Sequence, residues 1–146
     1  MLSDGIDGSA ARDASRPVEV AKMREGEMGF TQAISSGLSN YATFRGRSSR
    51  SAFWWFYLFN FLVSLGAAIL GSAVSETAGE VLHLVVTLAF LVPNIAIATR
   101  RLHDIGRSGW WQLLAVTLIG LLVLIYWWAQ PSQPGPNAYG AGPDLT

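Results

Sequence analysis

The chain has 146 residues, of which 51% are hydrophobic and 14% are charged, well below the charged fraction usual in soluble domains. Its ten basic and ten acidic residues cancel, and the absence of cysteine excludes disulfides, cysteine-ligated metals and thiol nucleophiles. Every basic residue lies before the first of three long apolar runs or between the second and the third. This distribution predicts an all-α membrane bundle with three transmembrane helices and a cytoplasmic N-terminus.

The first 43 residues divide into a tail and a helix. Residues 1–27 mix small and charged residues without a period, which predicts a disordered tail. In residues 28–43, Phe30, Ile34, Leu38 and Tyr41 recur at helical spacing, which predicts a short amphipathic helix before the membrane domain. Two interpretations stay open at this point: the apolar stripe lies in the headgroup plane, or it packs against the bundle.

The first predicted span covers about 53–74, a length of about 33 Å that suffices for the hydrocarbon core. Three arginines and an aromatic cluster precede or open it, as expected at a cytoplasmic interface. Small residues every fourth position, among them Ser64, Ala68 and Gly71, favour close approach of another helix. Asn60 is a polar side chain within the apolar run and needs a partner across such a contact.

The second predicted span covers about 81–98 and follows a short link that implies an antiparallel hairpin. Pro93 lacks an N–H, so a kink is expected there, and Asn94 could satisfy the backbone carbonyl that Pro93 frees. A structural kink and a Pro-Asn pair lining a transport pathway are both consistent with this pattern.

The third predicted span covers about 110–129 and ends in an aromatic cluster, and a Pro- and Gly-rich tail over 130–146 follows. Three crossings would place the C-terminus outside. A cytoplasmic C-terminus would instead require the third span to be re-entrant or would add a missed span.

Three segments of the chain carry a recognisable pattern. They are Tyr41-Ala-Thr-Phe-Arg-Gly-Arg-Ser-Ser-Arg-Ser-Ala-Phe-Trp-Trp-Phe56, Arg100-Arg-Leu-His-Asp104 with Arg107-Ser-Gly-Trp-Trp111, and Pro131-Ser-Gln-Pro-Gly-Pro-Asn-Ala-Tyr-Gly140. Together they resemble the domain of unknown function 805 family of small bacterial inner-membrane proteins. Their order and spacing match the family over about residues 28–143. The resemblance implies a multi-helix protein of the bacterial inner membrane and implies no activity.

The predicted topology places the polar residues of the two basic segments on the cytoplasmic side. They are Arg45, Arg47, Arg50, Arg100, Arg101, His103, Asp104 and Arg107. This set predicts an anion-binding surface, because arginine contacts phosphate in a bidentate manner and anionic headgroups lie nearby. The alternative is that these arginines only orient the protein in the membrane. Asp104 could in either case clamp an arginine and fix the two loops together.

Other functions have little support in the residues. His103 and Asp104 are adjacent and cannot easily form the hydrogen bond of a catalytic triad, the two histidines lie at opposite ends of the second span, and no nucleotide or zinc-protease motif occurs. We therefore expect no enzyme, cofactor, metal or nucleic acid. The leading hypothesis is a non-enzymatic protein that binds anionic lipid or an acidic partner; the alternative is an oligomeric transporter or channel subunit using Asn60, His83 and Asn94.

Overall fold

A computed structural model describes residues 28–143, and this part of the chain is helical with no strand beyond one isolated bridge. The predicted all-α fold is therefore confirmed. The elements are α2 (Phe30–Ser39), α3 (Arg50–Ser72), α4 (Glu76–Asp104), the 3-10 helix η1 (Gly109–Val116) and α5 (Leu118–Ala129). The tail predicted over residues 1–27 lies outside the described residues.

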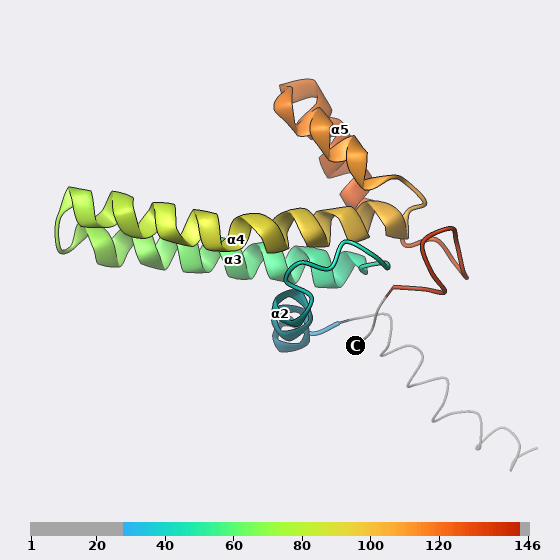
Figure 1. Ribbon diagram of the computed structural model, residues 1–146, viewed down its shortest axis with the longest axis horizontal. Coiled ribbons are helices and arrows are strands. Elements are labelled where there is room, and N and C mark those ends of the chain that lie inside the picture. The colour runs from blue at the N-terminus through green and yellow to red at the C-terminus, as the bar shows by residue number, and fades with distance from the viewer. Residues whose placement is uncertain (1–27, 144–146) are drawn as a thin grey trace, which may run out of the picture.

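The two long helices α3 and α4 lie side by side as an antiparallel hairpin, as predicted (Figure 1). Ser49 and Ser75 cap their N-termini by accepting the N–H groups of Ala52 and Ala78. Helix α4 extends beyond its predicted span of 81–98 at both ends, because the polar residues there continue the helix. Helix α3 begins before the predicted start at residue 53 and ends at Ser72, just before the predicted end at residue 74. Each is long and apolar enough to cross a membrane, and most of its apolar surface is not covered by protein. Exposure on this scale is expected where lipid replaces water.

A close contact between two glycines holds the hairpin together near its link. A Cβ atom placed on Gly71 would lie 2.4 Å from the Cα atom of Gly79, closer than any side chain allows. Glycine is therefore required for α3 and α4 to approach here. The prediction that Gly71 serves helix packing agrees with this contact.

Helix α4 continues through Pro93 without interruption. The missing N–H of Pro93 leaves the carbonyl of Ala89 without its helical donor, and the hydroxyl group of Tyr41 donates to that carbonyl instead. The predicted role of Asn94 in satisfying this carbonyl is therefore wrong. Tyr41 comes from the segment after α2, a contact that no local pattern could indicate.

Helix α2 packs on α3 through its small residues. A Cβ atom on Gly37 would overlap the ring of Phe56, so the two helices approach closely at this point. Ala33 and Ser36 are buried on the same face. In the predicted stripe, the ring of Phe30 lies 5.6 Å from that of Trp55 on α3 and Tyr41 donates to α4, while Phe30, Leu38 and Tyr41 are 37%, 44% and 40% exposed. The stripe therefore packs against the bundle in part, and the rest of its apolar surface is exposed.

The third apolar run differs most from its prediction. The single helix expected over 110–129 is two short helices, because Thr117 is extended between them at φ −110° and ψ 145°. The Thr117 hydroxyl caps α5 by accepting the N–H of Gly120 at 3.0 Å. The rings of Trp111 and Trp127 lie 5.6 Å apart, so the chain folds back and its two ends meet. The prediction of one continuous helix is wrong for this reason.

The fold-back gives an oblique second hairpin, η1–α5, over the half of α4 that carries the arginines (Figure 1). Its end reaches the main apolar core, which lies at this same end of α3 and α4. The core residues are Phe53, Phe56, Ile97, Ala98, Leu102, Leu124 and Trp128. The core therefore sits where α3, α4 and α5 converge, beside the arginines at the end of α4.

Candidate binding site at the arginine end

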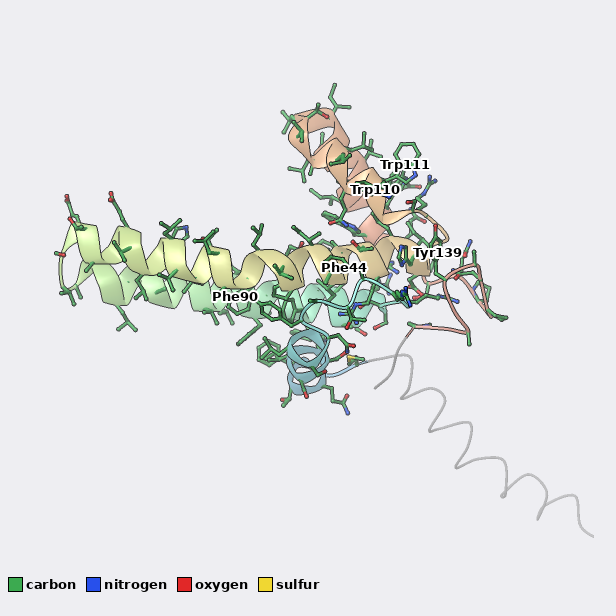
Figure 2. All side chains as sticks on the ribbon, viewed as in Figure 1. Phe44, Phe90, Trp110, Trp111 and Tyr139 are labelled. Atoms are coloured by element: carbon green, nitrogen blue, oxygen red, sulfur yellow. The ribbon has the colours of Figure 1, made fainter. Side chains whose placement is uncertain are left out.

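Segments far apart in the sequence meet at one end of α3 and α4, which we call the arginine end. Nitrogen and oxygen atoms gather there beside Tyr139, whereas most of the helix pair carries apolar side chains (Figure 2). The loop before α3 is tied to the end of α4 by a hydrogen bond from the Ser48 N–H to the Arg100 carbonyl at 3.0 Å. His103 Nδ1 lies 3.2 Å from the Gly46 carbonyl and acts as its donor.

A buried ion-pair cluster forms the centre of the arginine end. Asp104 accepts from Arg47 Nε at 3.1 Å through one carboxylate oxygen and from Arg101 Nη1 at 2.5 Å through the other. All three side chains are 0% exposed. Asp104 thus joins the loop before α3 to the end of α4, as predicted. The desolvation of buried charges offsets much of their attraction, whereas removal of one partner would leave a buried charge uncompensated.

The same two arginines hold the C-terminal segment. Arg47 donates to the carbonyls of Gln133 at 2.5 Å and Gly135 at 2.6 Å, and Arg101 donates to the carbonyls of Trp128 at 3.0 Å and Gln130. Carbonyl oxygens therefore supply the additional acceptors that a buried guanidinium requires.

The segment beyond Gly135 also docks here. Asn137 donates to the His103 carbonyl at 2.9 Å, and Tyr139 stacks on the His103 ring at 4.0 Å with planes 4° apart. Gly135 and Gly140 adopt positive φ angles that allow the chain to turn around this contact. Residues 130–140 therefore lie at the arginine end, not at the opposite end as three crossings would require.

The burial of these groups corrects the predicted anion-binding surface. Arg47, Arg100 and Arg101 are buried, as is Asp104, so they cannot present charge to a headgroup. The sequence shows their charge but not the carbonyls that surround them. Arg45, Arg50 and Arg107 remain exposed. Arg107 lies over the ring of Trp127 at 3.9 Å, a cation–π contact that directs it to the base of the η1–α5 hairpin.

Arg50 lines a cavity of about 640 Å³ at the start of α3. Trp54 and Trp55 form one part of its wall, and Pro131 and Ser132 of the docked C-terminal segment form another. The first turn of α3 contains no acidic residue, so the positive end of the helix dipole and the guanidinium act in the same direction. We call this cavity the Arg50 groove. Sequence reasoning identified Arg50 but missed Pro131 and Ser132, which only the fold-back brings here.

A second cavity of about 440 Å³ lies between α4 and η1 and is mostly apolar. Phe44 and Trp110 line it together with Ile95, Thr99 and Leu113. Gln112 Nε2 donates to Thr99 Oγ1 at 2.6 Å across the same interface, which fixes η1 on α4. Figure 2 labels Phe44, which comes from the loop before α3, and Trp110, which comes from η1.

The residues predicted for helix packing or a pathway do not converge on either cavity. Gly71 and Pro93 are buried, Asn60, Ser64 and Asn94 are half-buried, and Ala68 is exposed. Asn94 Oδ1 is a buried oxygen without a hydrogen-bond partner in the part of the chain that the structure describes. His83, named with Asn60 and Asn94 for transport, is exposed near the link.

Residues 41–141 match the family described as Protein of unknown function (DUF805). The chain belongs to this family. The matched range begins at Tyr41, which donates to α4, and ends just after Gly140, so it contains every contact of the buried ion-pair cluster. The predicted family resemblance is thereby confirmed.

Two relatives from Escherichia coli strain K12 are described as inner membrane proteins. YhaH is 36% identical over 112 residues, which cover 74% of this chain and 93% of YhaH. YhaI is 40% identical over 112 residues, which cover 74% of this chain and 92% of YhaI. No solved structure matches the chain. The DUF805 protein described here is therefore a membrane protein similar to inner-membrane relatives along almost their whole length.

Proposed function

We propose that the protein crosses the inner membrane more than once with its arginine end in the cytoplasm, and that the Arg50 groove binds the headgroup of an anionic phospholipid. In this proposal the protein is not an enzyme. Support for the orientation comes from charge: the arginines gather at one end of α3 and α4, whereas Glu76 and Glu80 lie at the other. Basic residues remain on the cytoplasmic side of membrane proteins.

The observation that carries the binding proposal is the exposed guanidinium of Arg50 in a groove walled by Trp54 and Trp55. Tryptophan pairs of this kind lie at headgroup depth, so the groove opens where lipid phosphates are. Arg50 can contact a phosphate through two parallel N–H groups, and each basic residue near an anionic surface contributes about 1 kcal/mol. Arg45 and Arg107, the other exposed arginines among residues 28–143, do not line the groove.

Native mass spectrometry of protein extracted gently from its own membrane tests the proposal. We expect a retained anionic lipid on the wild type, its loss from Arg50→Ala, and its retention by Arg45→Ala, which removes another exposed charge that lies outside the groove. Matching thermal stability of the two variants shows that both remain folded.

Four results would overturn the binding proposal. Equal lipid retention by both variants would leave the arginines as topology signals, and bare monomers in all samples would do the same. A co-purified acidic protein that only Arg50→Ala loses would assign the groove to that partner instead. A bare oligomer that dissociates on Asn94→Ala would favour the transporter alternative, since Asn94 carries the buried oxygen without a partner among residues 28–143.

A further inference from the structure

The η1–α5 hairpin begins and ends at the same end of the molecule. Trp111 near its start contacts Trp127 near its end, and the carbonyl of Trp128 accepts from the buried Arg101. The following segment is held by Arg47 through Gln133 and Gly135. The end of the hairpin is therefore anchored to the arginine end, and the Trp111–Trp127 contact joins its start to that anchored end.

The hairpin is too short to cross the hydrocarbon core. Eight residues of 3-10 helix at about 2.0 Å each and 12 of α-helix at about 1.5 Å each give arms of roughly 16 and 18 Å. The core of a bilayer is about 30 Å thick, so the arms reach about half of it.

The tip of the hairpin nevertheless has the composition expected in an apolar environment. No charged residue occurs between Arg107 and Asp144, and Val116, Leu118 and Ile119 at the tip are 87%, 76% and 77% exposed. Both backbone groups of Thr117, the residue at the break, are paired: its N–H donates to the Leu114 carbonyl at 3.0 Å, and its own carbonyl accepts from Leu121 N–H at 2.9 Å. Unpaired backbone groups are costly within the hydrocarbon core, so this pairing favours placing Thr117 there.

We propose that η1–α5 is a re-entrant hairpin whose partner is the acyl chains of the leaflet at the arginine end. The chain then crosses the membrane twice, through α3 and α4, and residues 130–143 return to the side from which α3 enters. Figure 1 shows the hairpin leaning back over α4, toward the apolar part of the helix pair. That this leaflet is the cytoplasmic one rests on the orientation proposed above. The return of residues 130–143 to the side from which α3 enters does not depend on that orientation.

The natural absence of cysteine makes a direct test straightforward, because each introduced cysteine is the sole thiol. We choose exposed positions: Ala42→Cys before α3, Thr77→Cys at the α3–α4 link, Val116→Cys at the hairpin tip and Ala138→Cys in the C-terminal segment. Each variant is labelled with a membrane-impermeant maleimide in right-side-out and inverted vesicles. Ala42→Cys and Ala138→Cys should react from one side, Thr77→Cys from the other, and Val116→Cys only after detergent is added.

A fluorophore on Val116→Cys then identifies what covers the tip. Quenching by lipids with a nitroxide on the acyl chain is the expected result. Reaction of Ala138→Cys from the Thr77 side would overturn the proposal in favour of three crossings, and reaction of Val116→Cys in intact vesicles would place the hairpin outside the bilayer. Absence of quenching with disulfide formation between Val116→Cys copies would assign the tip to a second copy. The labelling is repeated in the Arg50→Ala variant, in which the proposed headgroup binding is removed. A failure of the hairpin proposal can then be told from a failure of the lipid-binding proposal.

Discussion

Replacing Asp104 with asparagine should destabilise the protein by about 3–5 kcal/mol, because it leaves buried guanidinium groups without their counter-charge. The new amide would be isosteric with the carboxylate but can accept through one oxygen only, while the second position would present an NH₂ group to a donor. In the structure both carboxylate oxygens are used, at 3.1 Å by Arg47 and 2.5 Å by Arg101, and the side chains of both pairs are fully buried. The loss is large against the 5–15 kcal/mol that stabilises a typical protein.

Thermal unfolding in detergent, followed by tryptophan fluorescence, measures the effect. For a chain of this size each kcal/mol lowers the midpoint by about 3 °C, so we expect a decrease on the order of 10 °C. Trp128 reports on the core beside the cluster, because its ring is buried and its carbonyl accepts from Arg101. Limited trypsin digestion should also cleave after Arg47 and Arg101, which the wild type protects by burial.

Glu80→Gln is the matched control. It makes the same chemical change at an exposed carboxylate on α4, where substitutions usually change stability by less than about 0.5 kcal/mol. If Asp104→Asn lowers the midpoint no more than Glu80→Gln does, and trypsin still spares Arg47 and Arg101, the cluster does not hold the C-terminal segment and the reasoning is wrong.

Two further substitutions test contacts within the helical framework. Tyr41→Phe should cost about 1–3 kcal/mol by leaving an α4 carbonyl without a donor, whereas Tyr126→Phe at an exposed ring should not; equal midpoints for the two would contradict the proposed contact. Gly71→Ala should cost about 1–3 kcal/mol because its new methyl would meet the Gly79 backbone. Gly66→Ala, with open space around it, should be neutral or stabilising, and a loss of stability there as large as at Gly71 would refute the close-approach argument.

The sequence by itself determined the class of protein and its two long helices. Apolar runs of membrane length, a short link and arginines at their flanks are local properties, so α3, α4 and their hairpin followed from composition and spacing. The same holds for the family, because the segments between Tyr41 and Gly140 carry the resemblance without any knowledge of the fold.

Only the tertiary structure decided the direction of the third apolar run and the use of the arginines. Hydropathy reports how apolar a segment is and not which way it runs, so the turn at Thr117 was invisible in an unbroken apolar stretch. Arg47 meets Asp104 from 57 residues away and the Gly135 carbonyl from 88 residues away. Contacts at such separations leave no periodic signal, which is why Arg47, Arg101 and Asp104, predicted to lie on an exposed charged surface, form the buried centre of the arginine end.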